Sequence, residues 1–226
     1  MSPLLVIFSA GFGAATAAFL PRLAHRLAVG RADGPRPACA VCARPFSPGF
    51  SGWVRAGAAC CFGGYAWTTA AGATVAALLA VVIGPSPRLP PLLLAAVPGL
   101  LLAVIDRRCL RLPDRLVAAV GVLGGVPLAV LRPDRIAPAL LAAVAVLTAY
   151  GLMWVAGGLG LGDVKLAAVL AMILGFAGWP AVVVGVLAPH LINGPIALFV
   201  LVTGRRQIMP FGPALLVGAL IGLTAA

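Results

Sequence analysis

The sequence predicts an all-α polytopic membrane protein with about eight transmembrane helices and its amino end outside. The composition leads to this prediction: 62% of the residues are hydrophobic, only 9% are charged, and the mean hydropathy is +1.13. Soluble domains carry about 25% charged residues, so this chain cannot cover its surface with charge and must fold in lipid. Its long apolar runs do not alternate with polar residues, which favours helices over a barrel.

Eight apolar runs approach the length of about 20 residues that a helix needs to cross the hydrocarbon, although the fourth, sixth and eighth are short. We expect them to form one membrane-embedded domain over residues 1–226. Prolines at positions 98, 127, 189 and 195 fall inside these runs and are expected to bend or break helices. The runs are Leu4–Leu20, Tyr65–Gly84, Leu89–Ile105, Leu116–Leu131, Ala137–Ala156, Val164–Gly178, Ala181–Val202 and Phe211–Ala226.

The basic residues predict the orientation. With the amino end outside and eight crossings, 13 of the 16 Lys and Arg residues fall in cytoplasmic loops, and only Arg88, Arg132 and Arg135 lie outside. This distribution follows the positive-inside rule and predicts a multi-pass protein of the inner (cytoplasmic) membrane. Because the net charge of +11 sits in these short loops, it indicates contact with membrane lipid and no binding of nucleic acid.

The one sizeable polar segment, residues 21–59, is expected to be a short cytoplasmic loop. It carries Cys39 and Cys42 in a Cys-x-x-Cys pair, and the adjacent Cys60 and Cys61 follow it. A Cys-x-x-Cys pair facing the reducing cytoplasm suggests zinc more than a disulfide. Adjacent cysteines are a poor second pair, so we expect unpaired thiols and keep zinc as the alternative.

Two carboxylates lie where an apolar run meets its loop. The chain has five acidic residues, all Asp; Asp106 closes the third run and Asp163 opens the sixth, after the glycines Gly160 and Gly162. An ionised Asp at the edge of a bilayer is costly and seldom lacks a partner or a task. Two such groups brought together would share one proton, activate a water and polarise a peptide carbonyl, without a cofactor or metal.

We therefore predict that Asp106 and Asp163 are catalytic. Gly160 and Gly162 are expected to support them by adopting backbone conformations closed to other residues and by letting a substrate chain approach. Each aspartate could also have a purely structural role. Asp163 could only cap the following helix, and Asp106 could only form a salt bridge with Arg107 or Arg108.

The Gly160-Leu161-Gly162-Asp163 segment resembles the Gly-x-Gly-Asp signature of intramembrane aspartyl proteases. With Val164 and Lys165 following, it resembles the prepilin peptidase (type IV leader peptidase) family in particular. The segment from Asp106 to Leu112-Pro113-Asp114 is similar to the loop that follows the family's other aspartate, with Leu112 replacing the usual Ile. The first span, from Gly11 to Arg22, and the segment Met209-Pro210-Phe211-Gly212-Pro213 resemble the family's opening and last spans.

The resemblance implies an aspartic endopeptidase with Asp106 and Asp163 as its catalytic pair. Its substrate would be a type IV prepilin or pseudopilin, whose leader is cut on the cytoplasmic side. The family's bifunctional members carry two Cys-x-x-Cys pairs and also methylate the new amino terminus. This chain has one such pair, so we do not expect N-methyltransferase activity.

Two other functions are compatible with parts of the sequence. A proton- or cation-coupled small transporter would place its carboxylates near mid-membrane beside polar residues, and His190 and Asn193 in the seventh run favour this alternative. A non-catalytic scaffold of a pilus machinery would not need both aspartates.

Overall fold

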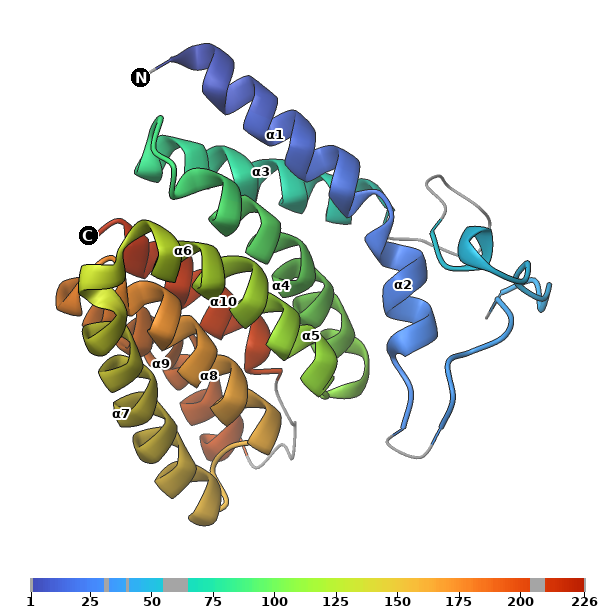
Figure 1. Cartoon of the computed structure of the whole chain (residues 1–226). Coiled ribbons are helices and arrows are strands. Elements are labelled where there is room, and N and C mark those ends of the chain that lie inside the picture. Colours follow the sequence, from blue (N-terminus) through green and yellow to red (C-terminus); the bar gives the residue numbers. More distant parts are fainter. Residues whose placement is uncertain (1, 31–32, 40, 55–64, 204–209, 226) are drawn as a thin grey trace.

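The structure, a computed structural model, describes residues 2–30, 33–39, 41–54, 65–203 and 210–225. These residues are mostly helical, and an isolated bridge between Ala38 and Pro45 is the one β contact among them. Two 3-10 turns, η1 (Phe50–Gly52) and η3 (Pro133–Arg135), and a π-helix, η2 (Gly121–Gly125), join the α-helices. In chain order the α-helices of Figure 1 are α1 (Pro3–Ala17), α2 (Leu20–Leu27), α3 (Tyr65–Ile83), α4 (Leu89–Cys109), α5 (Asp114–Val120), α6 (Val126–Leu131), α7 (Ile136–Val155), α8 (Leu161–Gly175), α9 (Trp179–Val202) and α10 (Gly212–Leu223).

The outside of the bundle is apolar. Phe8, Val130 and Leu191 are 74%, 77% and 75% exposed, as expected for side chains that face lipid. The chain is therefore an all-α polytopic membrane protein, as predicted; the count of eight spans and the outward amino end stay predictions, because α8 and α10 have only 15 and 12 residues. Within the described residues, five helical stretches are long and apolar enough to span a membrane: Pro3–Leu27, Tyr65–Ile83, Leu89–Cys109, Asp114–Leu131 and Pro133–Val155.

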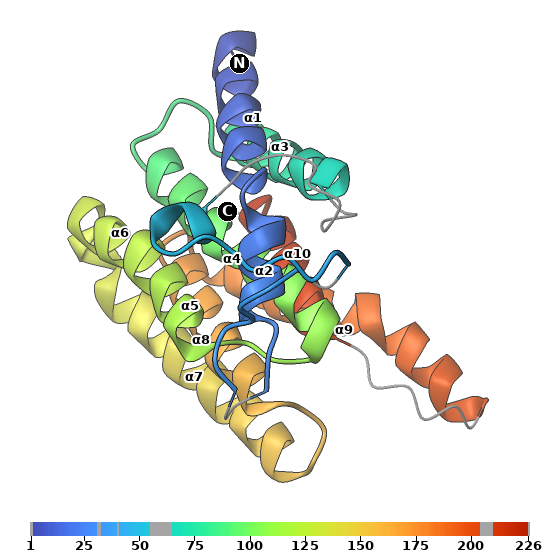
Figure 2. The same ribbon diagram turned by 90° about the vertical axis from the view of Figure 1, so that its right-hand side faces the viewer.

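Three helix pairs pack most extensively: α1 with α3, α7 with α8, and α9 with α10. Figures 1 and 2 show α1 and α3 at one edge of the bundle and α7 at the other. Glycines permit this packing, since Gly13 lies against the backbone of Gly72, and Gly222 against that of Ala181. Small residues serve this purpose in membranes, where no hydrophobic force drives helices together.

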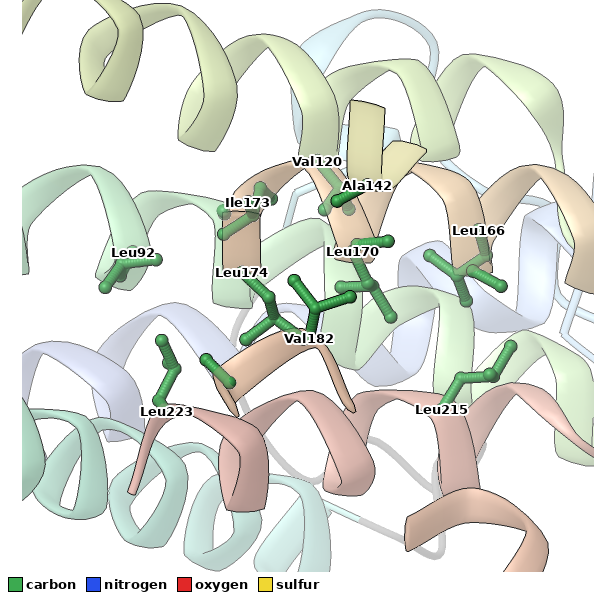
Figure 3. Packing of buried hydrophobic residues seen from close by; sticks show 14 of the residues in the cluster. Leu92, Val120, Ala142, Leu166, Leu170, Ile173, Leu174, Val182, Leu215 and Leu223 are labelled. Carbon is green, nitrogen blue, oxygen red and sulfur yellow. The ribbon is translucent and has the colours of Figure 1, made fainter. Parts of the chain in front are cut away.

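Helix α8, which carries Asp163, runs through the core. Its buried residues Leu166, Leu170 and Leu174 face side chains from the surrounding helices, including Val120 of α5 and Leu215 of α10 (Figure 3). A helix packed on several sides has a fixed position, so its first turn is held firmly relative to α4 and α10.

The helices accommodate their prolines. Helix α4 continues past Pro98, and α9 continues past Pro189 and Pro195, so these three prolines do not break their helices. At Pro127 the π-helix Gly121–Gly125 directly precedes the proline. Such a bulge is one of the recognised ways in which a helix changes its hydrogen bonding.

The polar segment begins later than predicted, because α2 continues the helical structure to Leu27. One side of α2 is apolar and packs on α4, while Arg26 on another side stacks on the Trp53 ring at 3.7 Å and donates to the carbonyl of Gly52 at 2.9 Å. Packing of its apolar side on α4 therefore keeps this segment helical despite its charged residues. The residues of this contact are Leu20, Ala24 and Ala28 with Leu101 and Ile105 of α4.

Candidate functional site

Both predicted catalytic residues lie at one end of the bundle, where four helix ends meet (Figure 1). Asp106 is in the last turn of α4, and Asp163 is in the first turn of α8. The beginnings of α5 and α10 lie beside them, since α4 packs on α5 and α10, and α8 packs on both as well. Chain direction explains the meeting: α4 ends where α5, α8 and α10 begin.

Asp106 is buried, with only 4% of its surface exposed. It follows Leu102 and Ile105, both fully buried, on the inner face of α4. The backbone N–H of Gly212, at the start of α10, donates to Asp106 Oδ2 at 2.9 Å. No ion pair of Asp106 occurs within the described residues, so the salt bridge with Arg107 or Arg108 is not present.

Asp163 is the third residue of α8, whose N-cap is Gly160. Its carboxylate turns back toward the N-cap, where a Cβ on Gly160 would lie 2.9 Å from Asp163 Oδ2, as the acidic residue of a capping box does. Yet Asp163 Oδ1 is buried and has no hydrogen-bond partner in the described part of the chain. Buried polar atoms normally have a partner, so the capping contact accounts for only part of this side chain.

The two carboxyl groups lie around one side chain, because Asp106 binds Gly212, Asp163 directly follows Gly162, and both glycines lie against Leu112. Leu112, which is 8% exposed, lies between the helix ends that hold them. A Cβ atom placed on Gly162 would lie 3.0 Å from the Leu112 Cβ, and one on Gly212 would lie 3.2 Å from its Cδ2. The spacing between the first turns of α8 and α10 therefore depends on the Leu112 side chain.

The glycines are needed here for space and not for unusual backbone angles. Gly160 has φ −80°, which any residue can adopt, so the conformational role predicted for it is wrong. A Cβ there would lie 2.9 Å from Asp163 Oδ2, and a Cβ on Gly212 would lie 2.9 Å from Asp106 Oδ2. The glycine with a left-handed backbone in this loop is Gly157, at φ +80°.

An aromatic cluster lies next to Gly212. It consists of Tyr150 of α7, His190 of α9 and Phe211, with the His190 ring centroid 5.5 Å from each of the other two. His190 Nδ1 donates to the carbonyl of Val186 at 2.9 Å. This hydrogen bond lies within α9 and satisfies the Nδ1 atom of a polar side chain in a membrane helix. The Nδ2 atom of Asn193 is buried without a partner among the described residues.

A groove of about 580 Å³ opens beside the site between α3, α4, α8 and α10. Its walls are apolar and include Ala96, Gly99 and Ala103, successive residues along one side of α4. At one end it reaches Arg107 and Pro213, which directly follow Asp106 and Gly212 in the chain. The groove therefore reaches the end of α4 and the start of α10, and neither Asp106 nor Gly212 lines it.

The cysteine segment does not form a metal site in the described residues, which contain no group of three His, Cys, Asp or Glu side chains able to hold an ion. Cys39 is disulfide-bonded, so the expectation of unpaired thiols is wrong at that position. Cys60 and Cys61 lie outside the described residues.

Three features of the site were not predicted from the sequence: the Gly212 N–H donor, the Leu112 side chain between the helix ends and the aromatic cluster. A signal for the Gly212 N–H donor was present in the motif containing Phe211, Gly212 and Pro213. This motif resembled a family pattern, but no role was assigned to it. Nothing in the sequence indicated that Tyr150 and His190 would lie against Phe211.

Comparison with known proteins identifies one family. Residues 92–223, which are more than half of the chain, match the type IV leader peptidase family. The matched region runs from α4 to the end of α10 and includes the whole candidate site. No curated protein and no solved structure matches the chain.

Proposed function

The chain belongs to the type IV leader peptidase family, and we propose that it is an intramembrane aspartyl endopeptidase with Asp106 and Asp163 as its catalytic pair. The observation that carries the proposal is that Asp106 and Asp163 lie at helix ends on either side of Leu112, where no described cation pairs with either. A buried carboxylate without a cation is costly. A buried carboxylate that lies near a second carboxylate therefore indicates a catalytic function.

Two close carboxyl groups hold one proton between them, because both cannot ionise comfortably. The ionised member takes a proton from water, and the resulting hydroxide attacks the scissile carbonyl carbon while the protonated member donates to the carbonyl oxygen. The tetrahedral intermediate then collapses, the C–N bond breaks and the leaving nitrogen receives a proton. The products are a carboxylic acid and a new amine.

We further propose that the substrate is a type IV prepilin or pseudopilin, whose hydrophobic stem lies in the groove beside α4. A stem in that groove would run along Ala96, Gly99 and Ala103 toward the end of α4 that carries Asp106. Small side chains on α4 suit this role, because they let another helix approach closely.

Cleavage is proposed to occur on the cytoplasmic side of the inner membrane. Arg107, Arg115 and Lys165 lie at the end of α4 and the beginnings of α5 and α8, whereas Arg88 precedes α4, and Arg132 and Arg135 lie between α6 and α7. By the positive-inside rule, the end with the aspartates faces the cytoplasm. Residues 1–226 would then act as one peptidase domain, with residues 21–59 on the same side and no methyltransferase activity.

Co-expression with a prepilin tests the proposal. We expect Asp106→Asn and Asp163→Asn each to lower leader removal by about 1,000-fold or more, because each change removes an acid or base from the pair. Asp134→Asn is the matched control, since Asp134 is an exposed aspartate at the opposite end of the bundle. All variants should accumulate in the membrane equally. Full processing by either of the first two variants would refute the proposal.

A further inference from the structure

The segment that joins α4 to α5 is only four residues long and is fixed at several points. Leu110 adopts the left-handed conformation at φ +54° and ends α4, with its N–H donating to the Asp106 carbonyl at 2.8 Å. Arg111 Nη1 donates to the carbonyl of Val29 at 2.6 Å, after the end of α2. Leu112 is buried against Gly162 and Gly212, as described above. This segment therefore contacts the surroundings of both carboxyl groups.

An ion pair closes the same segment onto α8. Lys165 Nζ lies 2.8 Å from Asp114 Oδ1, although the two residues are 51 positions apart in the chain. Asp114 is two residues after Leu112, and Lys165 is two residues after Asp163. Residues two apart on a helix do not face each other, so Lys165 points away from Asp163 and toward the start of α5.

The ion pair is too exposed to hold the fold together. The side chains of Lys165 and Asp114 are 42% and 70% exposed, and ion pairs in water contribute little to stability. Its location is more informative than its strength. It links the first turn of α8, which carries Asp163, to the segment that fixes the end of α4, which carries Asp106.

We propose that the Lys165–Asp114 ion pair, acting with Leu112, is a positioning device that sets the separation of the two carboxyl groups. The ion pair holds the first turn of α8 against the Leu112 segment, and Leu112 keeps Gly162 and Gly212 apart. Neither charged residue touches the reacting atoms. The inference rests on the proposed protease function and assigns these two residues a role within it.

A double-mutant cycle tests the device with purified protein and a full-length prepilin. Lys165→Met and Asp114→Asn remove the charges with little change of shape. We expect each to lower kcat about tenfold with KM changed less than twofold, and the double variant to be no worse than either single one. Lys165→Arg should keep most of the wild-type kcat. Thermal midpoints should change little, so that a loss of folding is excluded.

A second ion pair in the chain provides the control. Arg132 and Asp134 form an exposed pair at 3.2 Å at the opposite end of the bundle, and the same cycle with Arg132→Met and Asp134→Asn should leave kcat unchanged. Additive losses for Lys165 and Asp114, a loss confined to Lys165, or an effect on KM alone would overturn the inference. The proposed function is tested separately: it fails if Asp106→Asn or Asp163→Asn still cleaves, whatever the ion-pair variants do.

Discussion

The two ends of this bundle use aspartate in different ways. At one end Asp134, with 60% of its side chain exposed, lies 3.2 Å from Arg132 and 3.5 Å from Arg135. At the other end Asp106 is 4% exposed, accepts one backbone hydrogen bond, and forms no ion pair within the described residues. Asp134 is thus neutralised by local partners and solvated, as a surface carboxylate usually is.

The difference teaches that nearby arginines do not by themselves neutralise a carboxylate. Arg107 and Arg108 directly follow Asp106 in α4, yet adjacent residues on a helix do not face each other. Helical geometry therefore directs the arginines away from the carboxyl group. The same geometry separates Lys165 from Asp163, so that among the described residues neither carboxyl group of the candidate site pairs with a cation.

Gly212→Ala should have the largest effect among changes that leave both aspartates in place. The new methyl group would lie 2.9 Å from Asp106 Oδ2 and 3.2 Å from Leu112 Cδ2, so the carboxyl group must move. We expect kcat for prepilin cleavage to fall about 100-fold, as small displacements of reacting groups do. Gly11→Ala is the control, since no atom lies within 4 Å of a Cβ there. Equal activity of the two variants would mean that the close fit around Asp106 is not needed.

Gly162→Ala should have a smaller effect on the same measurement. Its methyl group would lie 3.0 Å from the Leu112 Cβ, and the atoms nearest to it all belong to Leu112 and not to a carboxyl group. We expect a loss of about tenfold in kcat, whereas Gly151→Ala in α7, where a Cβ meets open space, should be neutral. An unchanged kcat for Gly162→Ala would show that the spacing set by Leu112 is unimportant.

Filling the groove should affect substrate binding more than chemistry. Ala96→Phe places a large side chain among the groove residues of α4, and we expect KM to rise about three- to tenfold with kcat little changed. Ala145→Phe, at an exposed position on α7, should change neither constant. If both variants behave alike, the substrate does not use the groove.

The smallest effect is expected at the opposite end of the bundle. Asp134→Ala removes the carboxylate that pairs with Arg132 and Arg135, both of them exposed. Because exposed ion pairs contribute little, processing of the prepilin should stay within about twofold of wild type. A large loss would mean that the two ends are coupled, and would remove the contrast between them.

The sequence was sufficient to predict the helices and the location of the two aspartates. Apolar runs of the right length specify where helices form. The number of predicted crossings between Asp106 and Asp163 is even, which places both residues at the same end. Pro98 and Pro195 were expected to bend or break their helices, and both helices continue past them. The charged segment after Leu20 was expected to be a loop, but its apolar side packs on α4 and stays helical.

The contacts around the carboxyl groups could not be predicted in the same way. The Gly212 N–H meets Asp106 across 106 residues of chain, and Lys165 meets Asp114 across 51. Such contacts depend on the final packing of α4, α5, α8 and α10 and leave no periodic pattern in the sequence. For the same reason, Gly160 was assigned a conformational role when the structure requires only the absence of a side chain.

The convergence of Asp106 and Asp163 is the central claim, and cross-linking tests it most directly. In a variant whose native cysteines are replaced, Asp106→Cys and Asp163→Cys would be combined and treated with a short bifunctional thiol reagent in intact membranes. We predict an efficient intramolecular cross-link for this pair and none for the pair Asp106→Cys and Asp134→Cys, whose positions lie at opposite ends of the bundle. Failure of the first pair to cross-link, with both cysteines reactive toward a single-site thiol reagent, would contradict the claim.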